Sequence, residues 1–323
     1  MRRRWSPGPL TWAITLCGAI ALAAGLYPSA ATWISSYNQS LVIRNAATSM
    51  GDTEPAPTHQ LEQARAYNAA LVAGVRLDAG GNVPVVAANA AGTTLVYDQM
   101  LVAADDGLMA RIRIPSIGVD LPVFHGTSER TLLRGAGHLE GTHLPVGGEG
   151  TRAVITAHRG LAEAAMFTAL DRVTAGDVFT VEVFGEPLVY RVRDVQVIDP
   201  ADSATLIPEP GRDLVTLITC TPLGINSHRI VVTGERITPT PPDALAAAGD
   251  TPEGPGFPWW AVILLAGIGS LSLYLGRRGF LDVPRPDSSA AEVRGHVAGS
   301  QGRDGGSVMP RGRPSASRTI GPS

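Results

Sequence analysis

Two long uncharged runs, one near each end of the chain, restrict its fold more than any other feature of the sequence. Residues 10–27 and 258–275 contain no charged side chain, and each run is close to the roughly 20 residues that a helix needs to cross a bilayer. Arginines precede the first run and follow the second, whose other end begins with paired tryptophans. Because arginine favours the cytoplasmic side and tryptophan the interface, the sequence predicts two transmembrane helices with both termini in the cytoplasm.

Each run has an alternative interpretation. The first could be a signal peptide with its cleavage region near Ala30 and Ala31, but the run is long and bulky Trp33 and Ile34 follow it, which favours a retained anchor. The second could be a buried core helix, but it lacks any charge and is flanked by tryptophan and arginine. We therefore expect a two-pass protein of the cell membrane, with an extracellular domain between the spans.

The composition between and beyond these runs divides the chain further. The formal net charge is −3, so the composition does not indicate a nucleic-acid-binding protein. All 26 basic residues are arginine. The predicted division is a cytoplasmic N-terminus (1–9), an anchor (10–27), a region of helices and a long loop (28–108), a compact domain (109–237), a Pro/Gly-rich linker (238–257), a second span (258–275) and a disordered cytoplasmic tail (276–323).

Short apolar runs separated by Gly, Pro and Asp predict a mainly β domain of about 130 residues. One helix, over residues 161–170, is expected to interrupt the strands, and 36–47 and 60–73 have helical spacing before the domain. Residues 77–92 indicate a loop. The expected strands cover residues 110–114, 119–124, 153–156, 178–183, 188–197, 214–219 and 229–235.

The stretch "TLITCTPLGINSHRI" contains the one cysteine outside the apolar runs, Cys220. An unpaired cysteine in an extracytoplasmic domain is unusual, because oxidising compartments favour disulfides. The pattern predicts a strand that ends at Cys220, a turn, and a return strand that carries Arg229. A guanidinium beside a thiol can stabilise a thiolate or an oxyanion. A packed thiol and a solvated arginine are the structural alternatives.

A nucleophilic thiol also needs a general acid, for which histidine is suited. His158 follows an apolar strand directly in "AVITAHRGL", whereas His228 should point away from Arg229 in an extended strand. A hydrogen-bonded loop histidine is the alternative for His158. His125, His138 and His143 lack the spacing of a metal site, and we expect no metal and no cofactor.

"TLITC", with an arginine nine residues after the cysteine and "TAHRG" upstream, resembles the sortase family, and the similarity extends over residues 109–237. The strings "HRGL" and "TCTPLGINSHR", together with the second span, are most similar to the class C, pilus-assembling sortases of Gram-positive bacteria. The resemblance implies an eight-stranded β-barrel with short helices. It assigns Cys220 as the nucleophile, His158 as general acid and base, and Arg229 as the stabiliser of substrate or oxyanion.

The resemblance further implies cleavage of an LPxTG-like sorting signal between Thr and Gly, a thioacyl-enzyme, and transfer to an amine, typically a pilin lysine. The expected partners are pilin or surface-protein substrates, the acceptor amine and membrane lipid. Two departures stand out: no Asp-Pro-aromatic triplet occurs in residues 77–101, and Leu223 replaces a common aromatic. We expect residues 77–92 to gate the cleft only weakly.

Three other functions remain open on the sequence. A sortase that attaches single proteins to a peptidoglycan amine would share the same motifs. An inactive membrane-tethered scaffold would hold peptide tails without needing all three residues. A cysteine hydrolase on another fold would release the acyl group to water.

Overall fold

The structure, a computed structural model, describes residues 5–49, 53, 55–71, 75–76, 85–86, 96–103, 107–162 and 164–282. It divides into two compact units, one made of Met1–Thr15 and Ser272–Ser323 and the other of Leu16–Leu271. In the first unit, the amide of Ser6 donates to the carbonyl oxygen of Gly279 (2.9 Å). The Asp282 carboxylate accepts hydrogen bonds from the Gly8 amide (3.2 Å) and the Thr11 hydroxyl. These bonds join the residues at the start of the N-terminal helix to those at the end of the C-terminal helix.

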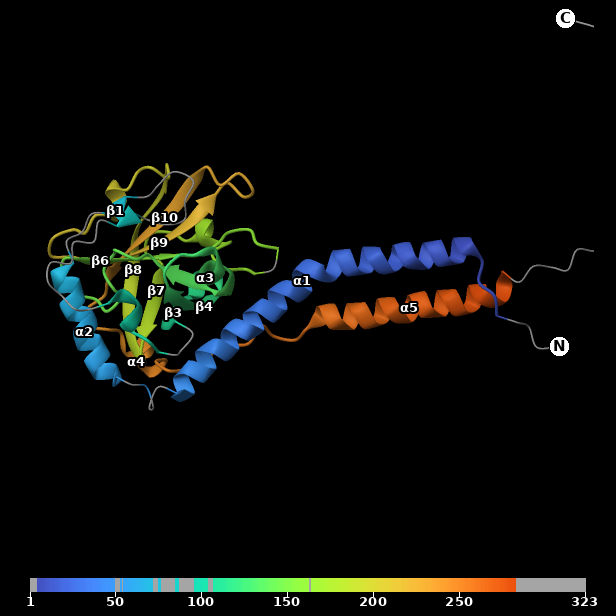
Figure 1. The fold of residues 1–323 in the computed structure, drawn as a ribbon, viewed down its shortest axis with the longest axis horizontal. Coiled ribbons are helices and arrows are strands. Elements are labelled where there is room, and N and C mark those ends of the chain that lie inside the picture. Colours follow the sequence, from blue (N-terminus) through green and yellow to red (C-terminus); the bar gives the residue numbers. More distant parts are fainter. Residues whose placement is uncertain are drawn as a thin grey trace, which may run out of the picture. The chain divides into compact units, whose positions relative to one another are not determined.

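The second unit is built around a closed β-barrel of eight strands within the described residues (Figure 1). Around the barrel the strands follow the order β10-β8-β7-β3-β4-β5-β6-β9. They are β3 (Leu108–Ile114), β4 (Val119–His125), β5 (Ala136–His138), β6 (Thr151–Thr156), β7 (Val178–Val183), β8 (Glu186–Ile198), β9 (Asp213–Thr221) and β10 (His228–Arg236). The barrel confirms the fold class that the sequence predicts, and seven of its strands overlap the expected runs.

The barrel core depends on large side chains that project inward. Phe179 of β7 and Tyr190 of β8 are fully buried and stack with ring centroids 5.5 Å apart. Gly234 of β10 lies against them, where the pairing with β8 shifts register, and a β-carbon there would collide with the Phe179 ring. The absence of a side chain at Gly234 therefore lets the strand bend over this aromatic pair.

Two of the strand pairs are parallel, β4 with β5 and β6 with β9, and the others are antiparallel. Parallel pairing brings the carboxyl ends of two strands to the same rim of the barrel. In the β6–β9 pair, Thr151 lies opposite Asp213 and Thr156 opposite Ile218. The segments that leave β6 and β9 therefore start beside each other.

The helix expected over 161–170 is wrong. The described residues of this segment form turns with an isolated bridge between Leu161 and Ala164, followed by a 3₁₀ turn at Leu170–Arg172. Helix is interrupted because Gly160 and Met166 both have positive φ, at 74° and 42°. A six-residue helix, α3 (Glu129–Arg134), instead follows β4, with Ser128 accepting a hydrogen bond at its N-terminus from the Thr131 amide.

Before the barrel, α2 (Pro57–Ala70) packs on it through side-chain amides. Asn68 pairs with Leu144 as a strand neighbour would, donating to its carbonyl oxygen (3.0 Å) and accepting from its amide (2.7 Å). Gln60 accepts from the Val102 amide (2.7 Å). Of the expected lid loop, residues 77–92, only Val85–Val86 lie within the described residues, as β2 paired with β1 (Val75–Arg76).

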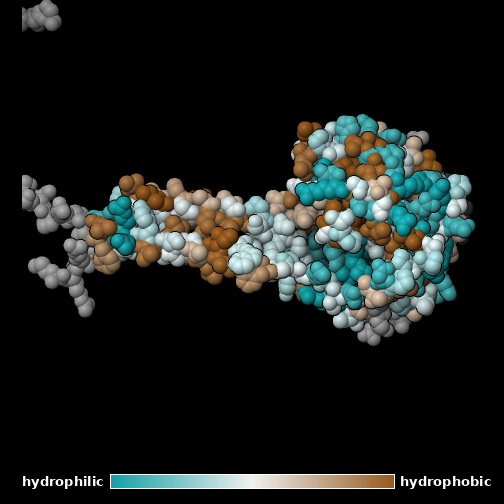
Figure 2. Space-filling view, turned by 180° about the vertical axis from the view of Figure 1, so that it is seen from behind, coloured by the Kyte–Doolittle hydropathy of each residue, from teal (hydrophilic) through white to brown (hydrophobic). Residues whose placement is uncertain are grey.

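In the part of the chain that the structure describes, two helices are long and apolar enough to cross a membrane. The first, α1 (Pro9–Ser49), joins the predicted span and the predicted helix after it into one element, and the second is α5 (Trp259–Leu281). Figure 2 shows apolar side chains along these helices and a mixed surface on the visible face of the barrel. Small residues let leucines approach closely: Gly18 faces Leu271, and Gly267 faces Leu22.

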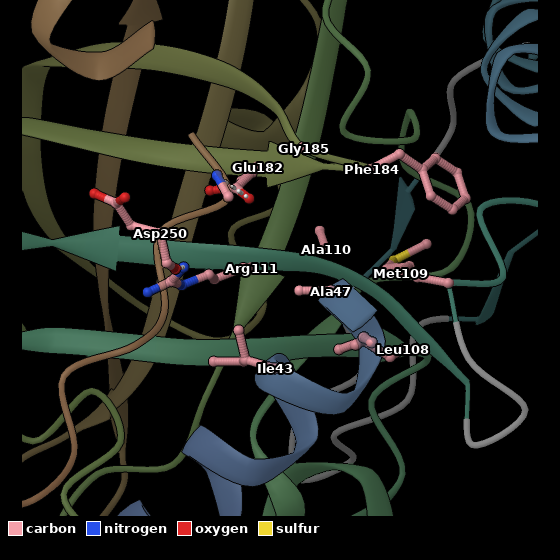
Figure 3. A pocket seen from close by; sticks show the side chains of 13 residues that line it. Ile43, Ala47, Leu108, Met109, Ala110, Arg111, Glu182, Phe184, Gly185 and Asp250 are labelled. Atoms are coloured by element: carbon pink, nitrogen blue, oxygen red, sulfur yellow. Dashed lines mark hydrogen bonds between the residues drawn. The ribbon is translucent and has the colours of Figure 1, made fainter. Parts of the chain in front are cut away.

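The end of α1 and the linker after the barrel both contact β3. Figure 3 shows Ile43 and Ala47 of α1 lining a small pocket with Ala110 and the neighbouring residues of β3. The Arg111 guanidinium forms a bidentate pair with Asp120 and donates to the Asp250 carbonyl oxygen (2.6 Å). Asp250 thus holds the predicted linker against the barrel wall. The linker also contains a short helix, α4 (Pro242–Ala246).

Candidate active site

The Cys220 thiol lies where β9 leaves the barrel core. Residues 214–219 of this strand are buried, whereas Cys220 and Thr221 are half-buried. The apolar and threonine side chains of "LVTLIT" are buried on both faces of the strand. The thiol is free, so an unpaired and partly accessible cysteine lies at the barrel rim.

Arg229 lies directly opposite Cys220 in the antiparallel β9–β10 pair. Side chains of directly opposed residues project from the same face of a sheet, so the guanidinium and the thiol share one face. Nη1 of Arg229 donates to the carbonyl oxygens of Asn226 (2.8 Å) and His228 (3.0 Å). His228 is exposed, and its Nδ1 lies 2.9 Å from the Ser227 hydroxyl, so this histidine belongs to the turn rather than to the thiol's face.

His158 reaches Cys220 through the parallel β6–β9 pair. Thr156 lies opposite Ile218, an offset of 62 residues, and His158 and Cys220 have the same offset (220 − 158 = 62). The Ala157 amide continues the ladder by donating to the Ile218 carbonyl oxygen (3.2 Å). The register therefore brings His158 level with Cys220, just past the end of β6.

Two side-chain hydrogen bonds bracket this pair. On one side, the Thr219 hydroxyl donates to the Ala157 carbonyl oxygen (2.8 Å). On the other, Nη1 of Arg159 donates to the Thr221 hydroxyl (2.7 Å). The residues before and after His158 are thus bonded to the residues before and after Cys220, so the structure brings all three sequence-predicted residues to one rim.

The imidazole of His158 is partly enclosed, with 18% of its side chain exposed. Its Nε2 is shielded from solvent and makes no hydrogen bond to any described residue, which leaves it available for proton transfer. A carboxylate oxygen of Glu129, the first residue of α3, lies 3.5 Å away, but the Glu129 side chain is 67% exposed. A thiol, an uncommitted imidazole and a guanidinium on one face can carry nucleophilic acyl transfer.

The turn between β9 and β10 supplies an apolar border to this rim. Leu223 and Ile225 are exposed, at 51% and 73%. Leu223 lies over Gly160, where a β-carbon would collide with its Cδ2. Leu223, the departure noted above, therefore lies against Gly160, two residues after His158. There it forms part of the surface that borders this rim.

The three other histidines flagged in the sequence do not converge on a metal site. His138 is fully buried, with Nδ1 2.9 Å from the Tyr97 hydroxyl and Nε2 2.8 Å from the His143 carbonyl oxygen. Burial lowers the pKa of His138 to about 4. Both ring nitrogens of His125 face backbone carbonyl oxygens. The described residues hold no group of three or more metal-ligating side chains.

Sequence reasoning missed the residues that bracket the pair, namely Arg159, Thr219 and Thr221. Their signal was present as the threonines on both sides of the cysteine in "TCT" and as the arginine after the histidine. Their significance depends on the β6–β9 register, which no local pattern contains. The pocket in Figure 3 includes none of the three sequence-predicted site residues.

Comparison with known proteins places this site in one family. The family model described as "Sortase domain" matches residues 112–237. The crystal structure of sortase C-1 from Actinomyces oris is 45% identical, with a TM-score of 0.50, over 56% of this chain and 98% of that one. The sortase C structure from Streptococcus pneumoniae, whose title refers to pilin substrate specificity, is 38% identical, with a TM-score of 0.54, over 62% of this chain and 98% of that one.

Sortase A of Bacillus anthracis is 30% identical over 130 residues, which cover 40% of this chain and 60% of that protein. The chain thus spans less than two thirds of the length of the curated relatives it matches first. The segment that the family model matches contains Cys220, His158 and Arg229 and covers most of the barrel, whose strands run from Leu108 to Arg236.

Proposed function

The chain belongs to the sortase family, whose members are cysteine transpeptidases, and on that premise we propose that it is a membrane-anchored transpeptidase acting through Cys220. One observation supports the proposal: Arg229 lies opposite Cys220 in the β9–β10 pair, and the residues on both sides of His158 bond to the residues on both sides of Cys220. In this proposal the substrate is a secreted protein with an LPxTG-like signal, cleaved between Thr and Gly.

The first half-reaction forms a thioester. The Cys220 thiol gives its proton to His158 as the sulfur attacks the carbonyl carbon of the threonine, and the developing oxyanion is stabilised by the Arg229 guanidinium. The carbon–nitrogen bond then breaks, and His158 gives a proton to the departing glycine amine. The uncommitted Nε2 of His158 supports this role, because a nitrogen already bonded to protein would have to give up that bond first.

The second half-reaction releases the acyl group. An incoming amine attacks the thioester, the carbon–sulfur bond breaks, and His158 accepts the proton that the amine loses. The product is a new amide bond. Water in place of the amine would give a free carboxylate, which is the outcome expected of a hydrolase.

We propose a pilin lysine as the acceptor, which would make the reaction a pilus polymerisation. Support comes from the similarity to sortase C structures and from the second apolar helix after the barrel. The alternative acceptor is a peptidoglycan amine, with single surface proteins as the cargo.

The two apolar helices support a two-pass topology with an extracellular barrel and cytoplasmic termini. In this arrangement the anchor and the barrel meet secreted substrates at the membrane surface. The aromatic contacts of Trp33 with Tyr37 and Trp260 fit an interfacial belt at the extracellular ends of both helices. Protease accessibility of tags placed at each terminus, in intact cells and after lysis, tests the topology.

The test of activity uses the full chain in detergent. It is incubated with an LPxTG peptide, and intact mass is recorded beside Cys220→Ala. We expect a hydroxylamine-sensitive acyl adduct on the parent alone. Lysine-containing and peptidoglycan-derived amines are then compared as acceptors, and the faster of the two identifies the product class. No adduct on the parent would contradict the proposal and favour a scaffold that only binds peptide tails.

A further inference from the structure

The side chain of Arg159 connects the segment that follows β6 to the end of β9. Its guanidinium is almost enclosed, with the side chain 8% exposed. Each nitrogen has a different partner: Nε donates to the Thr168 carbonyl oxygen (3.2 Å), Nη1 donates to the Thr221 hydroxyl (2.7 Å), and Nη2 forms an ion pair with the Asp171 carboxylate (2.8 Å). All three bonds use the fixed fork geometry of a guanidinium, which an ammonium group lacks.

The same segment is closed on itself around His158. The Phe167 amide donates to the His158 carbonyl oxygen (3.0 Å), and the Gly160 amide donates to the Thr168 hydroxyl (3.1 Å). Residues 158–168 therefore form a closed turn whose two ends lie together. Of the bonds described for this turn, the one from Arg159 to Thr221 is the one that links it to β9 beyond the cysteine.

This link has a counterpart on the other side of the site. Before the pair, the Thr219 hydroxyl bonds the Ala157 carbonyl oxygen, and that bond continues the β6–β9 ladder. After the pair, the ladder has ended, because β6 stops at Thr156 and β9 stops at Thr221. Without the bond from Arg159, the backbone that carries His158 would be held level with Cys220 from one side only.

We propose that Arg159 is a positioning residue that sets the separation between His158 and Cys220 for acyl transfer. The proposal rests on the function proposed for Cys220. Arg159 does not touch the reacting atoms; it acts through the backbone of its neighbour and through Thr221. The Asp171 carboxylate neutralises its charge, which allows a guanidinium to remain in an enclosed place.

The expected effect is on the chemical step. A misplacement of about 1 Å in a catalytic group costs on the order of a hundredfold in rate. We therefore expect Arg159→Gln to lower kcat by about 10- to 100-fold, with KM changed less than about threefold, because the peptide surface around Leu223 and Ile225 stays in place. Arg159→Lys keeps the charge but loses the fork, so it should fall between the parent and Arg159→Gln.

The kinetic test compares full-length variants in detergent with equal amounts of folded protein. Thr221→Val removes the acceptor alone, and Arg172→Gln, at an exposed arginine in the same turn, is the matched control. If the two groups act through one bond, Arg159→Gln with Thr221→Val should be hardly slower than Arg159→Gln alone. Parent-like kcat in folded Arg159→Gln, strictly additive losses, or a change confined to KM would overturn the proposal.

A second measurement does not depend on substrate. In a Cys17→Ser background, His158→Cys places two thiols at the paired positions, and a disulfide between them requires Cα atoms about 4.4–6.8 Å apart. With diamide as the oxidant, we expect rapid loss of two hydrogens by mass, slowed at least about tenfold when Arg159→Gln is added. Equal rates of disulfide formation with and without Arg159→Gln would overturn the proposal. If Arg159→Gln is too unstable to assay, Thr221→Val takes its place in the same comparison.

The two measurements separate the possible failures. If the parent never acylates Cys220, the proposed function is wrong, while the disulfide rates still decide whether Arg159 sets the separation. If the parent acylates and both measurements show no effect of Arg159, the function stands and the positioning role fails.

Discussion

The side-chain amide of Gln39, in α1, lies between the turn that follows His158 and the end of α3. Its Nε2 is 3.5 Å from the Met166 sulfur and 3.3 Å from the Arg134 carbonyl oxygen, and the residue is buried. Met166 is one of the two positive-φ residues that shape this turn. Helix α1 thus contacts the turn that follows the candidate general acid.

This contact predicts that Gln39→Ala weakens both stability and rate. A buried hydrogen bond contributes about 1 kcal/mol, so the free energy of unfolding should fall by about that amount. We expect acyl transfer to slow by about two- to fivefold, measured on the full chain, because the turn loses one of its outer supports. Thr48→Ala, at an exposed site on the same helix, is the control, and an equal effect of both changes would contradict the prediction.

Glu129 should matter little, although its carboxylate lies 3.5 Å from Nε2 of His158. The Glu129 side chain is largely exposed, and exposed ion pairs contribute at most about 1 kcal/mol. We expect Glu129→Gln to change kcat/KM by less than about fivefold. A loss of a hundredfold would show that the carboxylate takes a direct part in proton transfer through His158.

Arg229→Lys tests the geometry on the other side of Cys220. The guanidinium bonds the Asn226 and His228 carbonyl oxygens through Nη1 alone, and a guanidinium has further N–H donors. A lysine ammonium is a compact point charge, so it cannot bond these carbonyl oxygens and also stabilise the oxyanion. We expect kcat to fall at least about tenfold, with Arg191→Lys, on an exposed position of β8, as the control.

Gly160 and Leu223 should show strong coupling. Gly160→Ala introduces a β-carbon at φ 74° and into contact with Leu223, so it should cost more than about 1 kcal/mol in stability and lower the rate. Leu223→Ala removes the collision but leaves the backbone strain. The double variant should therefore recover part of the lost activity, whereas additive losses would mean that the two residues do not meet in solution.

His138 makes the barrel sensitive to acid. Burial lowers its folded-state pKa to about 4, while an unfolded histidine takes up a proton near pH 6.5. Between these values the unfolded state binds more protons, so stability is fully present above about pH 6.5 and is lost as the pH falls towards 4, by about 3 kcal/mol. Thermal unfolding from pH 7 to pH 4 measures this loss.

His138→Gln is the matched variant, since its amide can accept from Tyr97 and donate to the His143 carbonyl oxygen. This change should flatten the acid limb relative to the parent. His143, whose pKa burial also lowers, leaves a smaller residual dependence. An identical pH profile for parent and variant would assign the acid sensitivity to other groups.

Most of the barrel could be predicted from the sequence because its strands are long enough to show alternation or a buried run. β5 could not, since Ala136–His138 offers three residues and no period, and its place is set by parallel pairing with β4. The expected helix over 161–170 failed for a related reason. Its alanines and leucines favour helix locally, but the bonds from Arg159 and Gly160 to Thr168 impose a turn.

The candidate site was predictable only as far as residue type and family resemblance allow. The spacing of Cys220 and Arg229 follows from one hairpin, so the sequence pattern contains it. The placement of His158 depends instead on a parallel register between segments 62 residues apart. Nothing local in either segment specifies that offset, which is why Arg159 and the threonines beside Cys220 had no visible partners in the sequence.

The offset of 62 residues has a consequence for the newly synthesised chain. The thiol and the imidazole come together only when a loop of that length closes between β6 and β9, with β7 and β8 formed in between. Closing a long loop costs entropy that is recovered only once the distant strands pair. Under the proposed function, a newly synthesised chain therefore carries Cys220 without its general acid, and reactivity begins with the last steps of barrel closure.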